Sequence, residues 1–85
     1  MQLNFTQSFE KEFKHLTKNN WRLKKKIKEQ LSCLLKNPQH PSLRLHKLKN
    51  SYYWSISIDM SIRILFLYKN DGIYIYHVGK HEDVY

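Results

Sequence analysis

The segment WSISIDMSIRILFLYKNDGIYIYHV, residues 54–78, holds the strongest structural signal in this 85-residue chain. Apolar and polar residues alternate over 54–59, which is typical of a half-buried β-strand. The nearly continuous apolar run 62–69 predicts a central strand, and 73–78 predicts another. The Asn-Asp-Gly turn at 70–72 joins these two strands, because such residues tolerate the positive φ angles of a tight hairpin. The segment therefore predicts neighbouring antiparallel strands.

Upstream of this segment the apolar spacing changes to that of a helix. From Phe9, apolar residues recur four and seven positions further on, so they line one face of a short first helix. The hydroxyl of Thr6 or Ser8 can cap this helix by accepting a hydrogen bond from a backbone N–H of its first turn. Residues 1–5 alternate between apolar and polar and predict a strand before it.

A second helix is predicted between Trp21 and Asn37. Its apolar stripe is formed by Leu23, Ile27, Leu31 and Leu34. The helix ends there because Pro38 lacks a backbone N–H and disfavours helical geometry in the residue before it. Residues 43–48 alternate weakly and predict an edge strand. The whole pattern predicts one α+β domain over residues 1–85 with the order β-α-α-β-β-β-β, in which a helical hairpin packs on one face of a mostly antiparallel, twisted sheet.

The charge of the chain is strongly positive and unevenly distributed. Fifteen Lys and Arg stand against 7 Asp and Glu, which gives a net charge of +8. Residues 1–50 hold 12 basic and 3 acidic side chains, whereas residues 51–85 hold 3 basic and 4 acidic ones. Such a segregated positive field suggests a polyanionic partner, either nucleic acid or an acidic protein. The alternative is a helix surface that is charged only for solubility.

The sequence gives no indication of a membrane or of an oxidising compartment. The longest apolar run, 64–68, is far shorter than the roughly 20 residues that a membrane span needs. Residues 1–5 lack the basic and apolar regions of a secretory signal. Cys33 is the single cysteine, so an internal disulfide cannot form. We therefore expect a cytoplasmic protein without membrane contact.

Several classes of enzyme lack their residues in this sequence. The chain has 2 glycines and no glycine-rich phosphate loop. His77 and His81 have the spacing of a helical zinc pair, but Gly79 between them favours the end of a strand. The acidic pair at 82–83 lies in a polar tail, away from any apolar strand that could hold glycosidase carboxylates. We expect no metal ion and no organic cofactor.

The remaining His, Arg, Lys and Tyr side chains suit metal-free RNA cleavage. Attack of a 2′-hydroxyl on the adjacent phosphate needs a base for that hydroxyl and an acid for the leaving 5′-oxygen. It also needs a cation that stabilises the extra charge on the phosphorane. His titrates near neutral pH, Arg offers a planar fork to phosphate oxygens, and Tyr can stack on a base. Basic domains of other functions contain the same residue types, so composition alone leaves the activity open.

Two segments resemble the RelE/ParE superfamily, the toxins of bacterial type II toxin–antitoxin pairs. They are SIRILF at 61–66 and HVGKHEDVY at 77–85, and the second is the more specific. The resemblance covers essentially the whole chain and implies the same β-α-α-β-β-β-β order. It implies an endoribonuclease of the RelE/YafQ-like branch, which cuts mRNA in the ribosomal A site without a metal. The implied partners are the ribosome with its mRNA, a cognate antitoxin, and an oligomer with that antitoxin on operator DNA.

The resemblance also implies roles for individual residues. Arg63 matches the strand arginine that contacts the scissile phosphate. His81 falls where RelE has an arginine and where YafQ-like members have a catalytic histidine, and Tyr85 matches the terminal aromatic residue that positions the nucleotide. These three are the predicted catalytic residues. His46 resembles an upstream histidine of the YafQ-like branch. The predicted substrate-binding residues are His46, Lys47 and Lys49.

Each assignment has a structural alternative. Arg63 could pair with Asp59 or Asp83 instead of a phosphate. His81 could be an ordinary exposed histidine, and Tyr85 could belong to a frayed chain end. The basic residues at 46–49 could protect an edge strand from aggregation rather than bind phosphates.

The sequence departs from RelE on the strand before Arg63. Two lysines of RelE correspond to Ser55 and Ser57, which cannot supply a cation or a base at neutral pH. Proton transfer in an RNA-cleaving reaction would then fall to His81 and His46. The alternatives are a ParE-like toxin that binds and inhibits DNA gyrase without nuclease activity, and a general nucleic-acid-binding domain.

Overall fold

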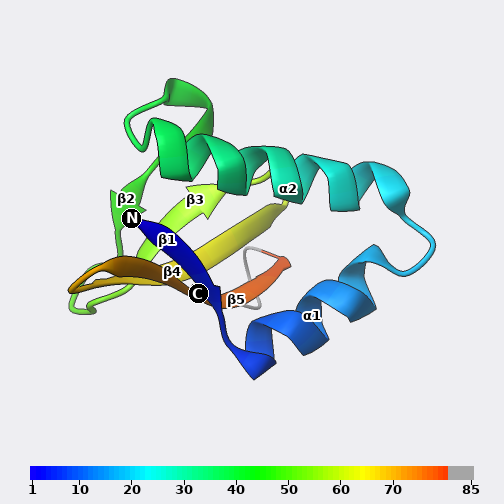
Figure 1. Cartoon of the computed structure of the whole chain (residues 1–85). Helices are drawn as coiled ribbons and strands as arrows, with labels where there is room; N and C mark the ends of the chain where they lie inside the picture. Colours follow the sequence, from blue (N-terminus) through cyan, green and yellow to red (C-terminus); the bar gives the residue numbers. More distant parts are fainter. Residues whose placement is uncertain (81–85) are drawn as a thin grey trace.

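The structure, a computed structural model, describes residues 1–80. Its elements are β1 (Gln2–Phe5), α1 (Gln7–Thr17), α2 (Trp21–Lys36), the 3₁₀ turn η1 (Pro41–Leu43), β2 (His46–Lys47), β3 (Trp54–Ser57), β4 (Ile62–Lys69) and β5 (Gly72–Lys80). This order confirms the predicted α+β class and the β-α-α-β-β-β-β sequence (Figure 1). None of the helices in this part of the chain is long and apolar enough to cross a membrane.

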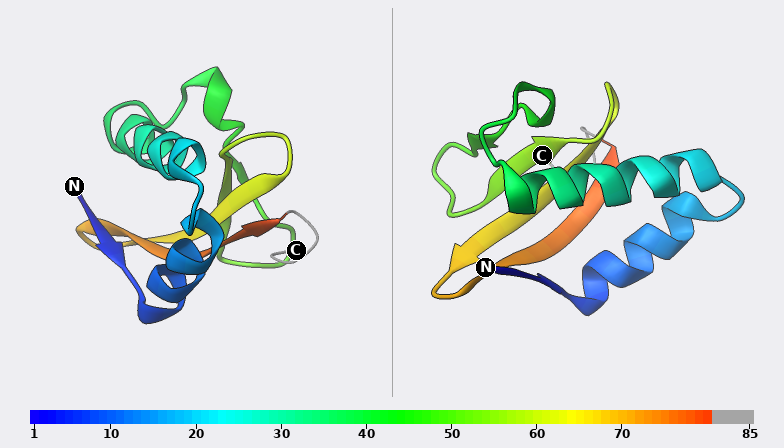
Figure 2. Two further views of the ribbon diagram at one scale, coloured as in Figure 1. Left: turned by 90° about the vertical axis from the view of Figure 1, so that its right-hand side faces the viewer. Right: turned by 45° about the horizontal axis from the view of Figure 1, so that its top comes forward.

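The five strands form one mixed sheet in the order β1-β5-β4-β3-β2. β1 runs parallel to β5, and the other three pairs are antiparallel. α2 lies across one face of the sheet and α1 lies beside β5 (Figure 2). Within residues 1–80 no helix covers the opposite face.

The two helices begin at side-chain caps. Oγ1 of Thr6 accepts a hydrogen bond from the N–H of Phe9 at 3.2 Å and donates to the carbonyl oxygen of Ile75 at 3.1 Å. The predicted Thr6 cap is therefore confirmed, and it also ties the start of α1 to β5. At the start of α2, Oδ1 of Asn20 accepts from the N–H of Leu23 at 3.1 Å.

The core lies between the helices and the sheet. Its fully buried members include Ile27 and Leu34 of α2, Leu43 of η1, and Ile56, Ile64, Phe66 and Ile75 of the sheet. Of the predicted α2 stripe, Leu23 is only partly buried and packs against this core. At its edge the rings of Trp54 and Tyr68 meet at 5.7 Å. Burial raises the pKa of the Tyr68 phenol, because a charged phenolate would lose its hydration there.

The strand predicted over residues 43–48 is wrong in its first half. Leu43 ends η1 and is fully buried, and Arg44 adopts a left-handed conformation with φ of 47°. Pairing with β3 is limited to the two residues of β2. Burial of Leu43 draws the chain into the core, and the turn at Arg44 returns it to the edge of the sheet. A period-two pattern does not reveal such a turn.

A buried amide holds η1 in place. Gln30 of α2 is 5% exposed, and its Nε2 donates to the carbonyl oxygens of Ser42 at 3.3 Å and of Ser57 at 3.0 Å. These bonds satisfy a polar group that would be costly to bury alone. They also connect α2 with the end of β3, which carries part of the site described below.

We expect Leu43→Ala to lower the free energy of unfolding by about 2–5 kcal/mol, because it leaves a cavity in a closely packed core. Met60→Ala is the control, since Met60 is 98% exposed, and it should change stability by at most about 0.5 kcal/mol. Urea unfolding followed by circular dichroism gives both values. Equally small effects of the two substitutions would show that Leu43 is not part of the core.

Candidate functional site

The face of the sheet away from α2, here called the open face, gathers side chains from four strands. His46 of β2 lies opposite Ser55 of β3. Leu65 of β4 lies between Ser55 and His77 of β5. Arg63 is two residues before Leu65 and shares its face, because side chains alternate along a strand. The fold thus brings two of the sequence-predicted site residues, Arg63 and His46, to the same surface.

Arg63 forms a polar cluster with His46 and Ser55, here called the Arg63 cluster. Its Nε donates to Oγ of Ser55 at 2.9 Å. Its Nη2 lies 3.5 Å from Nδ1 of His46 and donates to the carbonyl oxygen of Arg44, also at 3.5 Å. A guanidinium is thereby held beside an imidazole. Together these groups can bind a phosphate and transfer a proton next to it.

Ser55 and Ser57, the two serines of β3, have structural roles. Ser55 is fully buried and its hydroxyl fixes the direction of the Arg63 guanidinium. Oγ of Ser57 donates to the carbonyl oxygen of Asp59 at 2.8 Å. The contact between Ser55 and Arg63 could not be predicted from the sequence, because it depends on strand register.

The carboxylate of Asp59 caps the turn before β4. Its Oδ1 accepts hydrogen bonds from the backbone N–H groups of Ser61 and Ile62, both at 2.8 Å. These contacts give Asp59 a structural role in the turn. Asp83, the other proposed partner of Arg63, lies outside the described residues.

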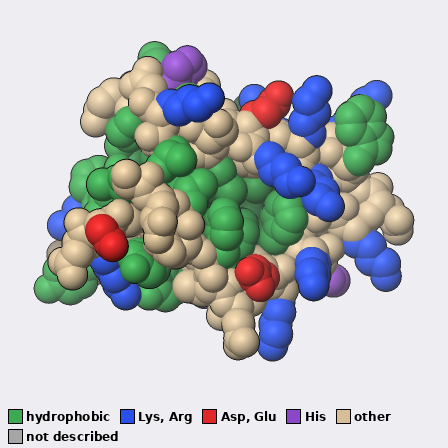
Figure 3. Space-filling view, viewed as in Figure 1, with side chains coloured by type: hydrophobic (Ala, Val, Ile, Leu, Met, Phe, Trp, Pro, Cys, Tyr) green, Lys and Arg blue, Asp and Glu red, His purple; other side chains and the backbone are tan. Residues whose placement is uncertain are grey.

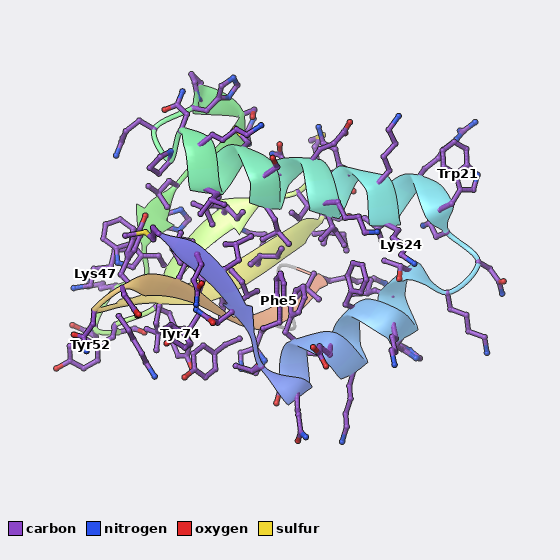
Figure 4. The ribbon with its side chains drawn as sticks, in the orientation of Figure 1. Phe5, Trp21, Lys24, Lys47, Tyr52 and Tyr74 are labelled. Carbon is purple, nitrogen blue, oxygen red and sulfur yellow. The ribbon has the colours of Figure 1, made fainter. Side chains whose placement is uncertain are left out.

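The remaining predicted residues lie away from the Arg63 cluster or outside the description. Lys47 follows His46 on β2 and so points to the other side of the strand. Its Nζ lies 6.0 Å from the centre of the Tyr52 ring (Figure 4). Lys49 is exposed in the turn after β2. The two predicted residues that fall outside residues 1–80 are His81 and Tyr85.

A second group of side chains lies on the open face beside β5. Nδ1 of His77 is 3.3 Å from both carboxylate oxygens of Glu12, and this carboxylate also accepts from the N–H of Val78 at 3.2 Å. The ring of Tyr53 lies 5.7 Å from that of Tyr76 and 6.3 Å from that of His77. Reasoning from the sequence missed this group, because the fold alone brings together residues that are 65 positions apart.

No group of three or more His, Cys, Asp or Glu side chains is placed to hold a metal ion in the part of the chain that the structure describes. β5 continues to Lys80, so His77 lies on a strand. This agrees with the prediction made from Gly79, which favoured a strand over a helix. The observed partner of His77 is the carboxylate of Glu12.

An apolar groove of about 450 Å³ lies between α1 and α2. The rings of Phe5, Phe9 and Phe13 stack along it with centroids 5.3 and 5.7 Å apart. Its charged lining consists of Lys14, Lys24, Lys28 and Glu10, so the rim is basic on balance. Figure 3 shows the exposed hydrophobic surface between the helices, and Figure 4 labels Phe5 and Lys24, which line the groove from β1 and from α2. An apolar strip with a basic rim suits an amphipathic segment of opposite charge.

Comparisons with known proteins find one family and several related structures. Residues 3–85 match the family described as ParE toxin of type II toxin–antitoxin systems. The comparison with curated proteins finds no match. A copper-bound mutant toxin from Helicobacter pylori is similar with 25% identity and a TM-score of 0.85, over 100% of this chain and 99% of that chain.

Two further solved structures share the fold. YafQ from Escherichia coli is 16% identical with a TM-score of 0.82, over 98% of this chain and 96% of YafQ. A chain of the YoeB–YefM complex from Staphylococcus aureus is 24% identical with a TM-score of 0.78, over 93% of this chain and 94% of that chain. The predicted superfamily resemblance is thereby confirmed at the level of family and fold.

Proposed function

This chain belongs to the family of ParE toxins of type II toxin–antitoxin systems. We propose that, within this family of toxins, it is a ribosome-dependent endoribonuclease that cleaves mRNA in the ribosomal A site. The observation that carries the proposal is the 3.5 Å separation between Nη2 of Arg63 and Nδ1 of His46 on the open face. The resemblance of residues 77–85 to the mRNA-cleaving branch supports the same activity. The ribosome contributes by holding the mRNA in line for attack.

The proposed reaction uses side chains for every proton transfer. The 2′-oxygen attacks the adjacent phosphorus while one histidine takes the hydroxyl proton. The bond from phosphorus to the 5′-oxygen breaks while a second histidine protonates the leaving oxygen, which gives a 2′,3′-cyclic phosphate and a 5′-hydroxyl. We assign these two transfers to His46 and His81. Arg63 stabilises the charge that develops on the phosphorane, and Tyr85 orients the nucleotide.

Lys47 and Lys49 are proposed to contact phosphates further along the mRNA. Both are exposed and follow His46 closely in the chain. Exposed cations attract a phosphate backbone without regard to sequence, and salt screens this attraction. They therefore add affinity for RNA and take no part in the bond changes.

Inhibition of DNA gyrase is the second candidate function. The matched family is that of ParE toxins, and Ser55 and Ser57 stand where RelE has lysines. Adding the purified chain to a gyrase supercoiling reaction and to a reconstituted translation reaction separates the two candidates. Arrest of translation with normal supercoiling supports the nuclease, whereas loss of supercoiling with normal translation supports the gyrase inhibitor.

We further propose that the cognate antitoxin binds the groove between α1 and α2 through an acidic amphipathic segment. Phe5 is 46% exposed in this groove, and three lysines line it. Apolar burial would supply affinity, while the basic rim would select acidic side chains. Structures of this fold include a heterotetrameric toxin–antitoxin complex, YoeB–YefM from Staphylococcus aureus.

We expect the double substitution Lys24→Glu and Lys28→Glu to weaken antitoxin binding on the order of tenfold at low salt, because it places like charges across the interface. The control is the double substitution Lys18→Glu and Lys36→Glu, which reverses the same number of exposed charges outside the groove. Titration calorimetry with the cognate antitoxin measures both affinities. Equal losses from the two proteins would mean that net charge, and not this groove, determines binding.

A further inference from the structure

We propose that the side chains of Tyr53, Tyr76 and His77, here called the stacking shelf, hold one nucleobase of single-stranded RNA beside the phosphate that Arg63 binds. The inference rests on the proposed nuclease function and adds the part of the site that recognises a base. The resemblance to known toxins gave these three residues no role. We infer a role for them from their position on the open face.

The three rings of the stacking shelf come from two separate parts of the sheet. Tyr53 directly precedes β3, whereas Tyr76 and His77 belong to β5, and β4 lies between these strands. The Tyr53 ring nevertheless lies 5.7 Å from the Tyr76 ring, which it meets edge to face. Tyr53 therefore reaches across β4 on the open face, and the three rings form one continuous aromatic surface.

Polar contacts hold two of these rings, and all three residues of the stacking shelf are partly exposed. Nδ1 of His77 is bound by the Glu12 carboxylate, and 38% of the His77 side chain is exposed. The hydroxyl of Tyr76 accepts a hydrogen bond from Nζ of Lys69 at 3.1 Å. Because the rings are already fixed, stacking a base on them costs little side-chain entropy. Preorganised aromatic faces of this kind are what single-stranded RNA recognition uses.

The stacking shelf lies next to Arg63 in the sheet. Arg63 pairs with Gly79, and Leu65 pairs with His77, so His77 is the diagonal neighbour of Arg63 across β4 and β5. Diagonal neighbours on one face have Cα atoms about 7–8 Å apart. A base attached to a nucleotide at the bound phosphate can therefore reach the shelf while the phosphate stays at Arg63.

A cation completes the far rim of the stacking shelf. Nζ of Lys69 lies 5.6 Å from the centre of the Tyr76 ring and 5.0 Å from that of Tyr74. An ammonium at this position can contact the next phosphate of a strand whose base is stacked on Tyr76. Arg63 and Lys69 thus lie on the two sides of an aromatic surface, the arrangement that a single strand of RNA requires.

The competing explanation is that these rings only cover the open face. Leu65 is 4% exposed although it points away from α2, so tyrosines above it would also serve as packing. Packing predicts that Tyr53→Leu changes stability and leaves base recognition unaltered. Stacking predicts that the same substitution changes cleavage, and that Tyr53→Phe, which keeps the ring, changes it much less.

The test measures cleavage of ribosome-bound mRNA whose A-site codon is varied one base at a time. We expect Tyr53→Leu to lower kcat/KM by about 5- to 150-fold, as loss of a stacked base predicts. It should also reduce the modest preference that differences in stacking strength produce at one codon position. Tyr53→Phe, which keeps the ring, should lose much less than Tyr53→Leu. Tyr52→Leu is the matched control, because Tyr52 is 85% exposed and lies outside the stacking shelf.

A second measurement uses the wild-type chain and therefore does not depend on whether a variant folds. A ribosome-bound mRNA with 2-aminopurine in the A-site codon and 2′-O-methyl groups that prevent cleavage should lose fluorescence when the wild-type chain binds. Full cleavage and unchanged codon preference in folded Tyr53→Leu, or binding without a fluorescence change, would overturn the stacking shelf alone. If the wild-type chain made no cut in unmodified mRNA, the proposed function would fall and the stacking shelf with it.

Discussion

Arg63→Ala is expected to lower the rate of mRNA cleavage by about 10²- to 10³-fold, the usual cost of removing one group that stabilises developing negative charge. The guanidinium is held by Ser55 and lies 3.5 Å from Nδ1 of His46, which places a cation beside the proposed general acid or base. Single-turnover cleavage of ribosome-bound mRNA measures the loss directly. Expression of the variant should no longer arrest growth.

Two further substitutions test whether the geometry of the Arg63 guanidinium matters in addition to its positive charge. Arg63→Lys keeps the charge but loses the planar fork and the Nε contact with Ser55, so it should recover only part of the rate. Arg22→Ala removes the same charge from the exposed start of α2 and should stay within about twofold of the wild-type rate. Circular dichroism shows whether each variant is folded. A folded Arg63→Ala protein with full activity is incompatible with the proposed mechanism.

His46→Ala and His81→Ala are each expected to slow cleavage by about 10²- to 10⁴-fold, the contribution of one general acid or base. His46 is exposed on the two-residue strand β2, so its substitution should leave the core intact. His15→Ala, an exposed histidine on α1, should have no effect. Rates for the three variants on the same mRNA test these assignments.

A substrate with sulfur in place of the scissile 5′-oxygen tells the acid from the base. A thiolate leaves without a proton, since its pKa is far below that of an alcohol. The variant that lacks the general acid should therefore cut this substrate at nearly the wild-type rate, and the variant that lacks the base should remain slow. Rescue of both histidine variants, or of neither, would show that the two residues do not divide the proton transfers between them.

The sequence predicted most of the fold because the sheet depends on local patterns. Strands β3, β4 and β5 each show either alternation or a long apolar run. The predicted hairpin between β4 and β5 is present, but no residue of 70–72 has a positive φ, so the turn forms without the left-handed conformation that the sequence predicted. The edge strand predicted over residues 43–48 was wrong in its first half for a local reason as well. Leu43 is buried against α2 and the sheet, and Arg44 turns with a left-handed φ. A non-glycine residue in that conformation has no clear mark in a single sequence.

The candidate site was predictable only in part. The resemblance to known toxins pointed to Arg63 and His46, but their contact depends on the pairing of β2, β3 and β4. Ser55 supplies neither a cation nor a base, and its contact with Nε of Arg63 could not be predicted from the sequence. The pairing of Glu12 with His77 joins α1 to β5, and no local pattern connects residues so far apart in the chain. Long-range contacts of this kind become visible only once strand register is known.

The most direct test of the central claim is to add the purified chain to a reconstituted translation reaction and to map the 5′ ends of the mRNA by primer extension. The proposal predicts cuts within the codon at the ribosomal A site, which disappear with Arg63→Ala and with His81→Ala. Cuts that persist with His81→Ala would leave the nuclease in place and move that proton transfer to another residue. Intact mRNA with normal translation would contradict the nuclease and leave gyrase as the target to examine.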